Sequence, residues 1–294
     1  MTQLAARLAL MFCLGALLPA QAHEFWINPA PTPLKTGEAA RLTLEVGEFF
    51  TGEKLPFVSA QTVALRLYSA AGVRDLAPLL TLRPSLPELA LPLALPGTHM
   101  VIFDSQPNMI VLSADKFHAY LHEEGLDFIK TRREGAGTAN KPGRERYRRY
   151  VKTLIRVDAA GAPDAVTPAP STAAAEDLTY AVKTGQRLEV LPLSNPLTMA
   201  PGDALPVQIL FEGQPLAGAL VKAWYKNGEQ KNGGQTLTIR ATTSADGKAT
   251  INLPFAGAWT VSVVHMVAAT GVKGIDWDSL WGNLSFSVPP GPAR

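Results

Sequence analysis

The sequence predicts an all-β protein made of two β-sandwich domains, immunoglobulin-like or prealbumin-like, with a short helical insertion in the first. Short runs of β-branched, aromatic and other apolar residues recur along the chain between Gly, Pro and Asp. These runs form two groups, and an Ala/Pro/Thr-rich stretch at 158–177 separates them as a flexible linker. We therefore expect an N-terminal sandwich at 23–157 and a C-terminal one at 178–294.

The first group of runs shows the alternation, or the continuous β-forming character, of strands in a sandwich. Its predicted strands are 40–46, 62–68, 98–103, 108–112 and 154–157.

A helix is expected to interrupt this first group. Ser113 is a suitable N-terminal cap, Phe117, Tyr120 and Leu121 follow at helical spacing, and Gly125 is a suitable stop.

The segment 130–152 is rich in Lys and Arg. We expect a solvated loop followed by a short helix, with Tyr147, Tyr150 and Val151 on one helical stripe. Binding of an anionic surface or partner is the alternative reading of these charges.

The second group has short strands at regular spacing, with turn signals such as Asp246-Gly247 between them. GQPLAGALVKAW followed by TTSADGKATINLPFAGAWTV is similar to the carboxypeptidase-regulatory-type β module of many exported proteins, and this resemblance implies binding or bracing more than catalysis. The predicted strands are 187–193, 204–211, 218–226, 235–243, 249–254, 258–266 and 284–288.

Residues 1–22 have the pattern of a cleaved signal peptide. Arg7 precedes an apolar run at 8–18, and Ala20-Gln21-Ala22 is a small-x-small cleavage site. The run is shorter than the roughly 20 residues that a membrane-spanning helix needs. We expect a periplasmic protein that begins at His23 and has no membrane span after cleavage.

Composition excludes several classes of function. Lys and Arg number 27 against 25 Asp and Glu, so nucleic acid is not the expected partner. The single cysteine, Cys13, lies in the leader, which leaves no thiol or disulfide afterwards. The chain also lacks a phosphate-binding Gly loop, a GxSxG elbow and an HExxH helix. Metal binding would therefore depend on His, Asp, Glu and Met, and we do not expect an enzyme.

His23 is the central candidate residue. At a chain start, its α-amino nitrogen and its Nδ1 can close one chelate ring on a metal ion. The α-amino group has a pKa of about 7.7–8.0, so it loses its proton more readily than a lysine. A second imidazole would complete a histidine brace, a nitrogen-rich site that favours Cu(II) and then Ni(II).

His265 is the expected second imidazole. It shares the parity of Trp259, Val261 and Val263 in an apolar strand, so it faces the same side of the sheet, whereas Met266 faces the other side. The alternative is a satisfied core histidine.

Two further residues are candidate contacts to the metal. Glu48 lies in VGEFFTGE, where flanking glycines indicate a shaped loop that carries it towards a site. His99 follows Gly97 and Thr98 at a strand start. His118 and His122 lie four apart on the predicted helix and share one face, but an exposed polar face explains them equally.

Several motifs together resemble a bacterial exported family of unknown function, formerly labelled as NikM-type nickel-uptake proteins. They are AHEFW, VGEFFTGE, FHAYLHEEGLDFI with RERYRRYVK, LEVLPLSNP, and AWTVSVVHM with DWDSLWGNLSFSV. The resemblance covers nearly all of the chain after the leader. It implies a two-domain β protein of the periplasm with a transition-metal role, and the positions that match its motifs are His23, Glu48 and His265.

The leading hypothesis is a periplasmic protein that binds Cu, Ni or Co and captures or delivers the metal for uptake, working with a metal transporter or outer-membrane receptor components. His23 and His265 would bind the ion, with Glu48 or His99 as a further contact. A copper-dependent monooxygenase of the histidine-brace type is the enzymatic alternative. A structural or adhesive β-sandwich protein is the third.

Overall fold

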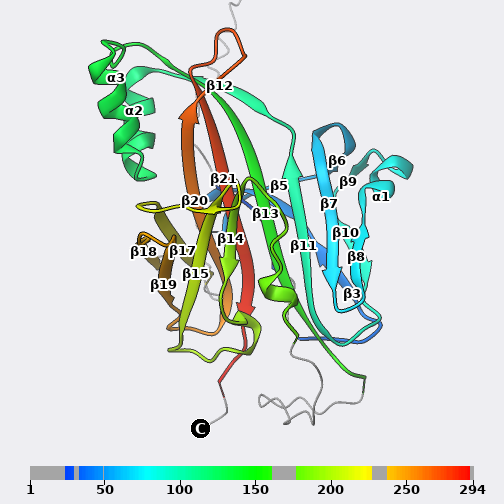
Figure 1. The fold of residues 1–294 in the computed structure, drawn as a ribbon. Helices are drawn as coiled ribbons and strands as arrows, with labels where there is room; N and C mark the ends of the chain where they lie inside the picture. Colours follow the sequence, from blue (N-terminus) through cyan, green and yellow to red (C-terminus); the bar gives the residue numbers. More distant parts are fainter. Residues whose placement is uncertain (1–23, 30–32, 49, 161–176, 227–236, 292–294) are drawn as a thin grey trace, which may run out of the picture.

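A computed structural model of the chain describes residues 24–29, 33–48, 50–160, 177–226 and 237–291. The predicted signal peptide, His23 and most of the predicted linker lie outside these residues. Strands predominate in the described part, as the sequence predicts (Figure 1). No helix in these ranges is both long and apolar enough to cross a membrane.

A ten-stranded sheet runs through the centre of the molecule (Figure 1). Its strands are, in spatial order, β18 (Thr238–Thr242), β17 (Leu220–Lys226), β20 (Gly257–Ala268), β21 (Trp277–Val288), β13 (Gly143–Asp158), β11 (Gly97–Ser105), β7 (Thr62–Ser69) and β8 (Gly72–Asp75), with β12 (Asn108–Leu112) and β2 (Leu34–Lys35) also paired to β13.

This sheet contains strands from both predicted domains. β13 and β21 are parallel neighbours, in register from Glu145 opposite Trp277 to Thr153 opposite Ser285. The strands of 23–157 and 178–294 are thus joined by continuous backbone pairing. The predicted boundary itself falls mostly in residues outside the described ranges and stays a prediction.

One face of the central sheet is covered by a second, four-stranded sheet. Side chains such as Met100, Ile102, Val261 and Val263 point to this face and form one apolar core with the covering strands. The covering elements are β14 (Leu188–Pro192), β15 (Ala204–Phe211), β16 (Gln214–Pro215) and β19 (Lys248–Asn252), together with the 3₁₀ turns η2 (Thr179–Ala181) and η3 (Pro196–Thr198).

The opposite face is covered by smaller pieces. Val101 and Phe103, which alternate with the residues of the first core, pack there against Phe25 and Ile27. The covering elements are β1 (Glu24–Ile27), β4 (Leu44–Glu48) and β5 (Thr51–Leu55) in one sheet, β3 (Ala39–Leu42) with β10 (Leu89–Pro92), β6 (Phe57–Val58) with β9 (Ser85–Leu86), η1 (Ser59–Gln61) and the short helix α1 (Ala77–Leu82).

Two helices, α2 (Ala114–Glu123) and α3 (Asp127–Gly135), cover the far end of this second face beside β20 and β21 (Figure 1). The predicted helix is confirmed as α2. Ser113 is its N-cap residue, and Gly125 follows it with a φ of +69°. Phe117 packs so closely on Gly143 that a β-carbon there would lie 2.3 Å from the ring, so only glycine fits at the start of β13.

The prediction for 130–152, a loop followed by a short helix, is wrong. Helix α3 occupies the start, where the loop was expected, and the part expected to be helical belongs to strand β13. Tyr150 and Val151 lie in different cores on opposite faces of the sheet, as alternation requires and a helical stripe forbids. Cations of this segment pair with acidic residues on the neighbouring strand. Arg146 makes two hydrogen bonds of 2.6 and 2.7 Å to Asp278 on β21.

A buried ion pair links the central sheet to the four-stranded layer. Lys152 Nζ on β13 lies 2.5 Å from Glu189 Oε1 on β14, and both side chains are at most 2% exposed. We expect Lys152→Met to lower the free energy of unfolding by about 3–5 kcal/mol, because it leaves a buried carboxylate without its counter-ion. Urea denaturation measures this.

The matched control is an exposed pair. Arg41 and Glu88 lie 2.6 Å apart with side chains 70% and 36% exposed, so Arg41→Ala should cost at most about 1 kcal/mol. Equal costs for the two substitutions would contradict the structural role of Lys152.

Candidate functional site

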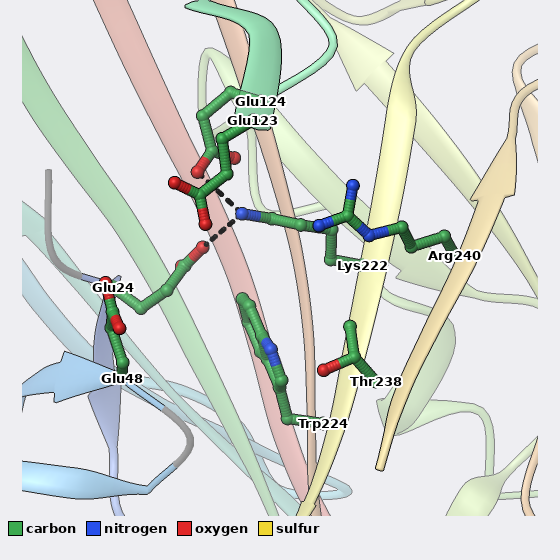
Figure 2. Close-up of a pocket in the computed structure, with 8 residues that line it drawn as sticks. All are labelled: Glu24, Glu48, Glu123, Glu124, Lys222, Trp224, Thr238 and Arg240. Atoms are coloured by element: carbon green, nitrogen blue, oxygen red, sulfur yellow. Dashed lines mark hydrogen bonds and ion pairs between the residues drawn. The ribbon is translucent and has the colours of Figure 1, made fainter. Parts of the chain in front are cut away.

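The described residues form a small acidic pocket where β1 and the end of α2 meet the edge of the central sheet. Its volume is about 40 Å³, enough for an ion or a few water molecules. Figure 2 shows the lining side chains converging from five elements. They are Glu24 on β1, Glu48 on β4, Glu123 on α2 with Glu124 just after it, Lys222 and Trp224 on β17, and Thr238 and Arg240 on β18.

Lys222 is the centre of the pocket. Its Nζ lies 2.6 Å from Glu124 Oε1 and 3.4 Å from Glu24 Oε1, and all three side chains are at most 7% exposed (Figure 2). Ser262 on β20 donates a hydrogen bond of 2.7 Å to the other oxygen of Glu24. Glu24 is therefore fixed to β17 and β20, two strands that follow it by about two hundred residues.

Burial and mutual repulsion set the protonation of this cluster. Burial, helped by the charge of Glu24, raises the pKa of Glu124 from 4.5 to about 8. Burial alone would lower the pKa of Lys222, but Glu24 and Glu124 outweigh it and raise that pKa. Glu124 therefore holds a proton at pH values where an ordinary glutamate is ionised, and the two carboxyl groups favour the charged form of Lys222.

One aromatic ring, that of Trp224, lines the pocket, and two further aromatic residues pack with it. The Lys222 ammonium lies 5.2 Å from the centre of the Trp224 ring, within the range of a cation–π contact. Trp224 belongs to a small buried cluster with Trp26 and Phe50. Phe50 has a φ of +56°, which is uncommon for a residue with a β-carbon, and its ring packs edge-on against Trp26 at 5.5 Å.

The glycines that bracket Glu48 act as the sequence predicts for a shaped loop. Gly47 and Gly52 face each other across the β4–β5 hairpin, and a β-carbon on Gly47 would lie 2.1 Å from the Thr51 carbonyl oxygen. This close approach positions Glu48 on the pocket wall.

A second buried acid lies on the same face of the sheet, under α2. Ser279 Oγ donates a hydrogen bond to Glu145, and burial raises the pKa of this carboxyl to about 7. Tyr120 stacks on Trp281 with ring centres 5.8 Å apart.

His265 lies on the other face of the sheet. Its ring is 4.6 Å from that of Phe211 and 6.4 Å from that of Phe128, and burial lowers its pKa. Met266 points to the opposite face, as predicted. Ser262, which holds Glu24, shares the parity of Met266, so Glu24 and His265 lie on different sides of β20.

The remaining predicted histidines lie apart from the pocket lining. His99 Nε2 is 2.9 Å from the Leu95 carbonyl oxygen, beside a separate cavity of about 200 Å³. His122 is exposed and lies 3.2 Å from Asp127. Within the described ranges, no three His, Cys, Asp or Glu side chains are arranged to hold a metal ion. His23 lies outside these ranges.

The sequence reasoning missed Glu24, Glu124 and Lys222. One signal was present: Lys222 is a cation flanked by apolar residues within the strand LVKAWYK, where a buried position requires an acidic partner. The identity of that partner could not be read from the sequence, because Glu124 is 98 residues away.

The fold and the site define a predominantly β protein with a central sheet covered on both faces and a buried acidic pocket at one edge. The chain belongs to a family described as a domain of unknown function (DUF4198), whose model matches residues 20–267. The match includes all four predicted metal contacts. No curated protein matches the chain.

Two solved structures are similar over most of the chain. The tandem V-type regions of VCBP3, a v-region-containing chitin binding protein, are 9% identical with a TM-score of 0.21, covering 89% of this chain and 98% of that one. The three N-terminal domains of the bacteriophage RB49 outer capsid protein Hoc are 8% identical with a TM-score of 0.19, covering 90% and 70%. Scores this low carry no argument about function.

The raised pKa of Glu124 predicts a pH-dependent stability. Between about pH 4.5 and 8 the folded state keeps a proton that the unfolded state loses, so the free energy of unfolding should fall as pH rises through this window. Glu124→Gln removes this contribution. We expect the melting temperature of this variant, relative to the unmodified protein, to increase from pH 5 to pH 8.5.

Glu134→Gln is the control, because Glu134 is exposed on α3 and does not line the pocket. Its melting temperature should stay parallel to that of the unmodified protein across the same range. A parallel curve for Glu124→Gln as well would show that Glu124 ionises normally in the folded protein.

Proposed function

We propose that this chain is an exported, periplasmic protein that binds a transition metal ion, copper or nickel in preference to cobalt, through His23. It would capture or deliver the ion for uptake together with a metal transporter or outer-membrane receptor component. The observation that supports this is the position of Glu24. This residue is bonded directly to His23, and its side chain is buried in an acidic pocket that also contains Glu48.

Covalent geometry links His23 to this pocket. Adjacent α-carbons are about 3.8 Å apart, so cleavage after Ala22 would create a free amine within a few bonds of Glu24. The amine and the imidazole Nδ1 would supply two nitrogen ligands, and Glu48 is a suitable oxygen ligand beside them. Because the described residues contain no complete metal site of their own, binding should require His23.

The charge of the pocket favours a cation. Four carboxylates line it against the two cations Lys222 and Arg240. With Glu124 protonated, an excess of negative charge still remains. Nitrogen ligands with a carboxylate suit Cu(II) and Ni(II). The nickel-uptake label of the family that the chain resembles is consistent with this proposal.

His265 is the second imidazole in the sequence-based version of this proposal. We favour Glu48 instead, because Glu24 and His265 lie on different faces of β20. His99 is less suitable, since its Nε2 is engaged by the Leu95 carbonyl group. The copper monooxygenase alternative depends on a second imidazole near His23, so this geometry favours a binding role. A structural or adhesive role requires no metal.

Titration with Cu(II) and Ni(II) tests the proposal. Protein that begins at His23 should bind at least about tenfold more tightly than the same protein acetylated on the His23 amine, because acetylation converts the amine to a non-basic amide. Isothermal titration calorimetry measures both affinities. Equal affinities would contradict a role for the terminal amine.

Variants of the His23-terminated protein identify the third ligand. Glu48→Gln should weaken binding several-fold, whereas Glu53→Gln, which alters an exposed residue of the same hairpin, should not. His265→Ala should leave the affinity unchanged. A loss of binding in His265→Ala without a loss in Glu48→Gln would favour the histidine brace, and the absence of binding in every form would leave the structural role.

A further inference from the structure

A further cavity is lined by residues of α3, β12 and the start of β13 and β21, elements that meet in the upper part of Figure 1. Its volume is about 710 Å³, within the range of about 300–1,000 Å³ that is typical of small-molecule sites. Its lining includes the cations Arg133, Lys141 and Arg144 and the indole of Trp277.

The cavity carries an excess of positive charge. Asp276 is the only acidic residue of its lining, against three cations, and Arg144 already binds it through two hydrogen bonds of 2.6 and 2.9 Å. The charge that remains is that of Arg133 and Lys141. Such a site favours an anion.

Hydrogen bonds from Arg133 to backbone carbonyl groups hold the cationic wall of the cavity in place. Arg133 is only 2% exposed, and its Nη2 donates to the carbonyl groups of Ala139 and Lys141 at 3.3 and 2.5 Å. Its guanidinium also lies 4.9 Å from the centre of the Phe117 ring. The turn that presents Lys141 is therefore fixed before any ligand arrives, which lowers the entropic cost of binding.

Two buried N–H donors of the lining residues lack an acceptor among the described residues. They are Trp277 Nε1 and Arg133 Nε. Buried donors are normally satisfied by protein, water or a ligand. The rest of the wall is apolar and comes from Val111, Ile275 and the Trp277 ring. Val111 is 63% exposed, so apolar surface is available for a ligand to cover.

We propose that this cavity binds a small organic carboxylate with a flat apolar or aromatic part. The carboxylate would pair with Lys141, while the ring would lie against Val111, Ile275 and the Trp277 ring. This site is separate from the acidic pocket and opposite to it in charge. It depends on no metal and on no residue before Glu24.

Naphthalene-2-carboxylate and its neutral amide form a matched pair of probes for this site. A charge-assisted hydrogen bond contributes about 1.5–3 kcal/mol, so the carboxylate should bind at least about tenfold more tightly than the amide. Calorimetry measures the affinities. In ¹⁵N-labelled protein, the indole N–H resonance of Trp277, assigned with Trp277→Phe, should shift during the titration with carboxylate.

Lys141→Gln should remove most of the preference for the carboxylate. Lys141 is exposed, so the fold should tolerate this change. Lys116→Gln, at an exposed position on α2, is the control and should leave the preference intact. Equal binding of the two probes, an unshifted Trp277 resonance, or an unchanged preference in Lys141→Gln would each overturn the proposal.

Discussion

Strands β13 and β21 run parallel and pair side by side, from Glu145 and Trp277 to Thr153 and Ser285. Parallel neighbours cannot be joined by a tight turn, and here the connection includes the entire four-stranded layer and the strands β17, β18 and β20 of the central sheet. This pairing makes the central sheet wide enough to be covered by β1 and the two helices on one face and by the four-stranded sheet on the other. Both the acidic pocket and the cationic cavity lie where the central sheet meets elements that cover it.

Buried charges specify how the covering layers are placed. Lys152 pairs with Glu189 across one face, and Lys222 pairs with Glu24 and Glu124 across the other. The desolvation of such pairs offsets much of their attraction, so they contribute little to net stability. A layer shifted by one residue would, however, leave a charge unpaired in the interior. We interpret both pairs as determinants of register, and the second pair also fixes the chain immediately after His23.

Local signals predicted much of the fold. The alternation of apolar residues in 62–68 and 108–112 involves only neighbouring residues. The same holds for the N-terminal cap, the apolar stripe and the terminal glycine of α2. These strands and this helix were confirmed. Only the end of β13 was recognised, as the predicted strand 154–157. Its first part was not, because RERYRRYVK fits both periods and Asp278, the partner of Arg146, lies 132 residues away. Gly47 and Gly52 predicted the tight turn of the chain that carries Glu48. The rest of the pocket was not predicted, since it depends on packing between distant segments.

The sequence separation between β13 and β21 also has a consequence for how the chain folds. During synthesis from the N-terminal end, β13 emerges 132 residues before the partner that pairs with it in parallel. Until then its edge presents unpaired backbone groups, which is a template for misassociation. Non-local pairing of this kind slows folding. Alternating arginines along this edge, at Arg144, Arg146 and Arg148, would repel a second copy of the same strand and so keep the unfinished sheet from aggregating.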